Sequence, residues 1–362
     1  MPTKKRNIFT KILIWRYKYI SERQFILVLS ILVGFLAGLG TVLLKYLTLF
    51  IQSVLEGGFI KNYYYSLYFI FPIIGVWLVY LIKKNFIKKE IGHGISTTLY
   101  SISKRSGIIE RYKMFASLIV APITVGFGGS VGLQGPAVST GAALGSNVAS
   151  MFHMNAKTRM LLIGCATAGA MSSMFKAPVA AIVFAVEIFS LDLVFTSLVP
   201  LLLASVAAVI TSYFFRGTDV LFSFELLDAW RVKDIVFYVL LGLATGIASV
   251  YFSKMYFLIT RFFSRFSNAY IKIGIAAIAI GFMLYLFPPL YGEGYGLINN
   301  LLNGNTEVAL SGIQYQIDFN NIWMVIVILL IIAVFKAIAM TTTFAAGGVG
   351  GIFIPTLFMG SA

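Results

Sequence analysis

The glycine-rich stretch at residues 126–136, which reads GFGGSVGLQGP, constrains the fold of this chain more than any other feature. It holds five glycines and lies in a run between Lys113 and Lys157 that contains no Asp, Glu, Lys or Arg. A helix needs about 20 residues to cross a membrane, so this run is too long for one crossing, and its glycines interrupt it too often for two. Glycine leaves backbone N–H groups uncovered and permits positive φ angles. Because irregular backbone at membrane depth persists only inside protein or along a cavity, the stretch predicts part of a binding site or pathway within a membrane.

The composition identifies an integral membrane protein. Hydrophobic residues make up 59% of the chain and charged residues 11%, with a mean hydropathy of +0.91, whereas soluble domains are about 45–50% apolar and about 25% charged. Five uncharged apolar windows have the length that a spanning helix needs: residues 25–44, 63–82, 193–215, 235–253 and 273–292. Because these windows are continuously apolar and do not alternate with polar residues, we expect an all-α membrane fold and not a barrel.

The basic residues predict how the chain is oriented in the membrane. The chain has 28 Lys and Arg against 13 Asp and Glu, a net charge of +15. Six basic residues lie in the first 20 positions, and Lys83, Lys84, Lys88 and Lys89 follow the second window. By the positive-inside rule both clusters face the cytoplasm, so we expect a cytoplasmic N-terminus in the inner or plasma membrane of the cell. Orientation and contact with anionic lipid account for most of the charge, and no nucleic-acid partner is expected.

The residue types needed for metal binding or catalysis are sparse. The one cysteine, Cys165, and two distant histidines, His93 and His153, predict no disulfide, no metal site and no cofactor. No paired acids and no nucleophile beside a base occur, so an enzyme is not expected. Lys176 and Glu187 are ionisable groups in apolar sequence and are candidates for function. A lysine that reaches the membrane interface and an acid that caps its helix explain them equally well.

A second glycine-rich stretch, AAGGVGGIFIP at residues 345–355, follows an apolar run at 319–335 and Lys336. One glycine-interrupted segment in each half of a chain is typical of transporters built from an inverted repeat, with the binding site where the halves meet. The predicted organisation is a basic cytoplasmic segment at residues 1–23, a first membrane half at 24–216, a connection at 217–234 and a second membrane half at 235–362 that contains a polar loop at 293–318.

Three helices are expected to begin at glycines: after Gly92 and Gly94, after Gly132 and Gly135, and after Gly350 and Gly351. The first N–H groups of a helix have no intrahelical partner, and the helix dipole adds a partial positive charge there. If the three starts converge, their N–H groups form a site for a small anion. Backbone donors bind weakly enough for the ion to leave, as conduction requires. No acidic residue lies in these stretches, which argues against a cation pathway.

Three short motifs give the chain a specific resemblance. GHGIS at residues 92–96, GLQGP at 132–136 and GIFIP at 351–355, in this order, resemble the motifs of the CLC family of chloride channels and chloride/proton antiporters, and MFKAP at 174–178 resembles a further family segment. The resemblance covers the chain from about residue 20 to its end. It implies a homodimer with one anion pore per subunit, built from tilted and broken helices in an inverted repeat. The anion-binding residues that it implies are His93, Gly94, Ile95, Gly132, Gln134, Gly135, Ile352 and Phe353.

Departures from the family pattern bear on proton coupling. Gln134 stands at the gate position, where the family has a glutamate whose carboxylate competes with chloride until it is protonated. Glutamine has nearly the shape of the protonated acid but cannot titrate. Ile188 replaces the inner proton-accepting glutamate of the antiporters, so the resemblance implies passive anion conduction. His93 stands where a serine commonly touches the anion, and its imidazole either donates an N–H to the ion or turns away into packing.

The leading interpretation is a chloride channel or uniporter that moves anions passively. A chloride/proton antiporter that uses another acid, such as Glu187, is one alternative, and a non-conducting membrane scaffold is another. The sequence ends at Ala362, soon after the third motif, whereas the family continues through several more helices. We therefore expect the family's C-terminal helices, including a pore tyrosine and part of the dimer interface, to be missing from this sequence. Two alternatives stay open: a fragment of a longer chain, or a complete chain that is not expected to conduct.

Overall fold

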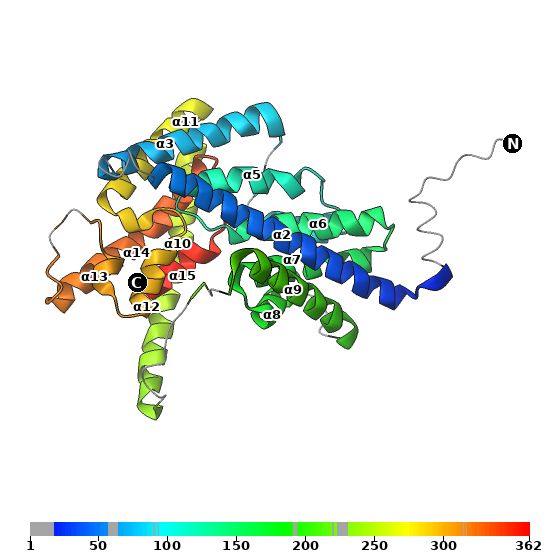
Figure 1. Ribbon diagram of the computed structural model, residues 1–362. Helices are drawn as coiled ribbons and strands as arrows, with labels where there is room; N and C mark the ends of the chain where they lie inside the picture. The colour runs from blue at the N-terminus through cyan, green and yellow to red at the C-terminus, as the bar shows by residue number, and fades with distance from the viewer. Residues whose placement is uncertain are drawn as a thin grey trace. The chain divides into compact units, whose positions relative to one another are not determined.

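The computed structural model describes residues 18–56, 64–89, 91–92, 94–190, 194–218, 221–222, 231–313, 315 and 317–362. The regular structure of these residues is helical, apart from one bridged pair, Gly132 and Gly351. Six of the described helices are long and apolar enough to cross a membrane, judged by length and composition. The all-α membrane architecture predicted from the apolar windows is therefore confirmed (Figure 1).

The α-helices have the following bounds in chain order: α2 Glu22–Glu56, α3 Tyr64–Ile82, α4 Ile95–Arg105, α5 Lys113–Gly126, α6 Gln134–Met151, α7 Ala156–Phe175, α8 Pro178–Phe189, α9 Phe195–Arg216, α10 Ile235–Ser264, α11 Ala269–Leu286, α12 Tyr295–Leu302, α13 Thr306–Ala309, α14 Ile322–Ala345 and α15 Phe353–Ser361. Short helical turns occur at η2 Lys83–Ile87, η3 Val232–Asp234 and η4 Pro288–Leu290. The fifth apolar window extends beyond the end of α11. Phe287 leaves the helical region (φ −132°, ψ 80°) because it precedes a proline, which disfavours α-helical backbone.

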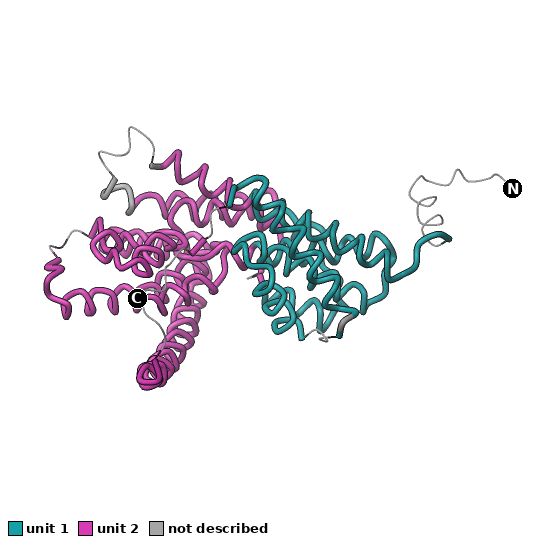
Figure 2. The backbone as a smooth tube through the Cα atoms, turned by 60° about the horizontal axis from the view of Figure 1, so that its bottom comes forward, with its two compact units in different colours: residues 1–43, 95–115, 137–219 teal, residues 44–94, 116–136, 220–362 magenta. Residues whose placement is uncertain are grey.

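The first compact unit contains residues 1–43, 95–115 and 137–219 (teal in Figure 2). Its central helix is α7, which packs against α8 and α9 and buries most of its residues. Helix α6 approaches α7 closely, since a Cβ added at Gly141 would lie 2.8 Å from the carbonyl oxygen of Ala166. Gly145, one turn further along α6, meets the carbonyl oxygen of Leu162 in the same way. Small residues at every fourth position of α6 thus permit close helix packing.

The second compact unit contains residues 44–94, 116–136 and 220–362 (magenta in Figure 2). In this unit α3 and α11 lie side by side (Figure 1), and α14 packs against α10, α11 and α15. The spanning segment Val232–Ser264, which includes α10, is covered least, because its most apolar window is 0% buried within the chain. Such a helix can be stable in lipid, where an apolar surface needs no protein cover.

The two compact units are defined by spatial proximity, and each is assembled from three separate stretches of chain. The boundaries predicted from the sequence, at residues 1–23, 24–216, 217–234 and 235–362, describe order along the chain and the sides of a membrane. They stay a prediction, as does the inverted relation between the two membrane halves.

Candidate functional site

The three helix starts predicted at glycines are present. They are α4 from Ile95 after Gly94, α6 from Gln134 after Gly132, and α15 from Phe353 after Gly350 and Gly351. Gly135 differs from the prediction in one detail, because it lies in the first turn of α6 and does not precede it. Each start places backbone N–H groups without helical partners directly beside glycine backbone.

The glycine segments meet in the second unit. The Gly132 N–H donates to the Gly351 carbonyl at 3.0 Å, and the Gly351 N–H donates to the Gly132 carbonyl at 2.7 Å. A Cβ at Gly135 would lie 2.8 Å from the Gly351 Cα. Gly94 has φ +58°, and a Cβ there would lie 2.5 Å from the Gly135 carbonyl oxygen. Because a side chain at any of these contacts would displace the backbone opposite, glycine is what allows the three segments to touch.

The predicted site residues have different outcomes. Gly94, Gly132 and Gly135 come together. Ile95 and Phe353 are the first residues of α4 and α15, and the preceding Ile352 caps α15 with its side chain exposed. His93 lies outside the described residues. Anion binding by these residues stays a prediction.

Gln134, at the predicted gate position, is buried, with 1% of its surface exposed. Its Nε2 donates a hydrogen bond to the Tyr295 hydroxyl, and its Oε1 lies against Gly132 with no hydrogen-bond partner among the described residues. A hydroxyl both donates and accepts, so Tyr295 can serve either end of the carboxamide. Rotation of the Gln134 carboxamide by 180° would therefore place the donor Nε2 beside Gly132 in place of the acceptor Oε1.

Glu293 and Lys45 form a buried ion pair that the sequence analysis did not place at the site. The Lys45 Nζ lies 2.8 Å from the Glu293 Oε2, and the two side chains are 7% and 8% exposed. The other carboxylate oxygen, Oε1, accepts the backbone N–H of Leu133 at 3.0 Å. The Lys45 Nζ also lies 4.3 Å from the centroid of the Tyr295 ring. An acid thus reaches the start of α6, although the motif at that start contains none.

Lys336 is a second buried lysine near Glu293. Its side chain is fully buried in α14, and its Nζ donates to the carbonyl oxygens of Gly292 at 3.0 Å and Leu290 at 3.3 Å. The same nitrogen lies 4.6 Å from the centroid of the Phe358 ring. Lys45 and Lys336 therefore contact the segment that carries Glu293 from α2 and from α14.

The predicted polar loop at residues 293–318 is wrong in its first part. Glu293 is buried, with 8% of its surface exposed, and the residues from Tyr295 to Leu302 form α12. The available signal was the pattern GEGYG at residues 292–296, in which an acid is placed between glycines that follow an apolar window. Gly292 and Gly294 have φ values of +56° and +85°, so the backbone turns sharply on both sides of Glu293.

The other ionisable candidates lie in the first unit. Lys176 ends α7 in a left-handed conformation with φ +55°, and its Nζ donates to the Gly217 carbonyl at 2.6 Å. Glu187 is exposed on α8, and Ile188 packs against an apolar cluster that includes Val138 and Phe189. These contacts favour structural roles for Lys176 and Ile188 and leave Glu187 at the surface of its helix.

A cavity of about 400 Å³ adjoins the buried ion pair. It is lined by Lys45, Thr48, Leu49, Gln52, Pro288, Pro289, Tyr291, Glu293, Gly294, Tyr295, Gly296 and Leu297. Its charged groups are Lys45 and Glu293, and Glu293 accepts the backbone N–H of Leu133 just before α6. We therefore place the candidate site at the glycine segments together with this cavity.

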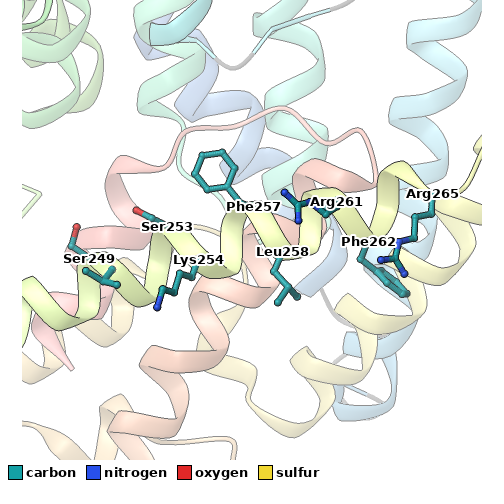
Figure 3. Close-up of a pocket in the computed structure, with 9 residues that line it drawn as sticks. Ser249, Ser253, Lys254, Phe257, Leu258, Arg261, Phe262 and Arg265 are labelled. Atoms are coloured by element: carbon teal, nitrogen blue, oxygen red, sulfur yellow. The ribbon is translucent and has the colours of Figure 1, made fainter.

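A larger hollow, of about 770 Å³, runs along α10 (Figure 3). It is lined by residues of that helix and by Arg265, which follows its last residue: Ser249, Val250, Ser253, Lys254, Phe257, Leu258, Arg261, Phe262 and Arg265. No residue of the glycine segments or of the buried charge cluster lines it. Since α10 is the helix that the chain covers least, this hollow is a helix surface and not the candidate site.

Comparisons with known proteins agree with the motifs. The chain is similar to a protein of Ralstonia nicotianae described as ClcB-like, with 25% identity over 280 residues that cover 74% of this chain and 60% of that protein. It is also similar to the H(+)/Cl(−) exchange transporter ClcA of Vibrio cholerae, with 27% identity over 245 residues that cover 66% of this chain and 48% of that protein. The chain thus spans about half to three fifths of the length of these relatives.

Two solved structures share the fold. A CLC-type fluoride/proton antiporter matches with a TM-score of 0.72 and 22% identity, over 92% of this chain and 78% of that one. A slow cyanobacterial Cl⁻/H⁺ antiporter matches with a TM-score of 0.72 and 18% identity, over 94% of this chain and 77% of that one. The family model described as voltage gated chloride channel matches residues 74–362, which include all three glycine motifs. The chain therefore belongs to the voltage gated chloride channel family, the CLC family that its motifs resemble.

Proposed function

We propose that this protein moves chloride or a similar small anion passively across a membrane, as a channel or uniporter. The proposal is carried by the meeting of three glycine segments, each of which leads into a helix. The N–H groups and dipoles of α4, α6 and α15 attract a small anion there. The proposed anion-binding residues are His93, Gly94, Ile95, Gly132, Gln134, Gly135, Ile352 and Phe353.

Passive movement is the favoured mode because the residues at the two proton-related positions do not titrate. Gln134 occupies the gate position, and its carboxamide has no proton to release at any accessible pH. Ile188 occupies the inner position and packs in an apolar cluster. We further propose a homodimer in the inner or plasma membrane, with a cytoplasmic N-terminus. The basic clusters support this orientation through the positive-inside rule.

Chloride flux tests the proposal directly. Liposomes that hold the purified protein and a chloride gradient are expected to release chloride when valinomycin carries potassium as the counter-ion, at a rate well above that of protein-free vesicles. A chloride electrode measures the release. Flux no greater than that of empty vesicles contradicts the proposal and leaves the non-conducting scaffold, against which normal chloride binding measured by calorimetry would count.

A chloride/proton antiporter is the second candidate. The buried carboxylate of Glu293, which contacts the start of α6, favours it, and a relative described as an H(+)/Cl(−) exchange transporter agrees with it. Under passive conduction, a chloride gradient is expected to move no protons against their own gradient. A pH electrode in the same liposomes measures this, and uphill proton movement decides for the antiporter.

A further inference from the structure

The Glu293 carboxylate occupies a backbone donor that the proposed pathway offers to an anion. Its Oε1 accepts the N–H of Leu133, which lies between Gly132 and Gln134 at the start of α6. An ionised carboxylate and a chloride ion place the same demand on an N–H group, since both bind it as charged acceptors. The two cannot use this donor at the same time. We propose that Glu293 competes with the transported anion for the start of α6, an inference that rests on the proposed function.

The chain holds Glu293 in place for this contact. Gly292 and Gly294 on either side have left-handed backbone, which directs the residue between them inward. A Cβ at Gly294 would lie 2.5 Å from the Phe358 ring and 3.5 Å from the Lys336 Nζ. Glu293 is thus fixed by its own turn, by α14 and by α15, and does not reach Leu133 by chance from a solvated loop.

The charged and titratable groups around Glu293 allow its carboxylate to release the Leu133 N–H and still keep a buried partner. Lys45 of α2 holds only Oε2, so Oε1 is the oxygen that is exchanged. Lys336 of α14 faces the same segment through the Gly292 carbonyl. Tyr291 and Tyr295 line the adjoining cavity. When an anion takes the Leu133 N–H, Glu293 therefore keeps its partner Lys45 through Oε2.

This assignment also explains why the gate position can hold a neutral residue. The Gln134 carboxamide is engaged by the Tyr295 hydroxyl, so it does not reach the donor that Glu293 uses. The competing carboxylate comes from a segment 160 residues further along the chain than that donor.

Chloride affinity at a fixed pH tests the competition. Lys45→Met combined with Glu293→Gln replaces both members of the ion pair by neutral side chains of similar size. The net charge around Leu133 is unchanged, because one positive and one negative charge are removed together. Titration calorimetry on the detergent-purified protein at pH 7 is expected to give roughly tenfold tighter chloride binding than in the parent, because a neutral acceptor binds the Leu133 N–H about half as strongly as a carboxylate. A purely structural role predicts equal or weaker binding, and that result overturns the proposal.

Controls separate this proposal from the proposed function. Arg105→Met with Glu110→Gln removes an exposed ion pair of 3.5 Å and is expected to leave chloride affinity unchanged. If the parent binds chloride and the double variant binds it no more tightly, the competition by Glu293 is overturned and the proposed function is not. No binding by either protein overturns the proposed function as well. If the double variant does not fold, Glu293→Asp keeps the charge beside Lys45 but shortens the reach to Leu133, and it too must bind chloride more tightly than the parent.

Discussion

Gln134→Glu is expected to give an anion flux that is at least tenfold lower than that of the parent at pH 7 and that recovers in acid. The new carboxylate is charged above its pKa and binds helix-start N–H groups more strongly than a neutral amide does. It therefore competes with the anion at neutral pH. Below its pKa the side chain is a neutral acid with nearly the shape of the parent glutamine, and the flux returns. Glutamate ordinarily has a pKa near 4.3, so the flux is expected to recover by half near that pH, mostly between about pH 5.3 and about pH 3.3.

Chloride efflux from liposomes across this pH range measures the effect. Gln52→Glu is the matched control, because Gln52 lines the cavity near Glu293 but does not lie at a helix start. It adds the same carboxylate to the cavity beside Glu293 and is expected to leave the shape of the pH profile close to that of the parent. Equal flux from the parent and from Gln134→Glu at every pH would show that residue 134 is not at the gate.

Lys45 and Lys336 explain why the sequence predicted where the apolar helices lie better than where they end. The first apolar window ends before Lys45 and a later apolar run ends before Lys336, because a charge normally marks the edge of a membrane span. In the structure α2 continues to Glu56 and α14 to Ala345. Lys45 is neutralised by Glu293, and Lys336 is held by two carbonyl oxygens. Each lysine thus has buried partners in other parts of the chain, which a count of charges along the sequence does not detect.

The glycine segments were predicted more completely, since what they require is local. A glycine at positive φ followed by an apolar helix is visible in the sequence, and Gly94 has such a conformation before α4. Glu293 was missed for the opposite reason, because its partners Leu133 and Lys45 are 160 and 248 residues away. Polar residues between glycines favour a solvated loop, unless a partner of opposite charge elsewhere in the chain compensates for their burial. The backbone of the candidate site could therefore be predicted, whereas its buried charges could not.

Gly135→Ala is expected to reduce anion flux at least tenfold and to lower the free energy of unfolding by about 1–3 kcal/mol, the usual effect of an added methyl group in a packed interior. The new Cβ would lie 2.8 Å from the Gly351 Cα and 2.9 Å from the Gly350 carbonyl oxygen. Both are backbone atoms, so the contact is relieved only if the segment before α15 moves away from α6. That movement strains the paired hydrogen bonds between Gly132 and Gly351 and separates the N–H groups that the anion is proposed to share.

Thermal unfolding in detergent and chloride efflux from liposomes separate the two effects of Gly135→Ala. Gly246→Ala in α10 is the matched control, because no atom lies within 4 Å of a Cβ built there. This control adds the same methyl group to a helix and is expected to be neutral or to stabilise by up to about 1 kcal/mol, since glycine inside a helix is unfavourable relative to alanine. Its flux should equal that of the parent. A Gly135→Ala protein that unfolds at a lower temperature but conducts normally would mean that contact of the glycine segments matters for folding and not for the anion pathway.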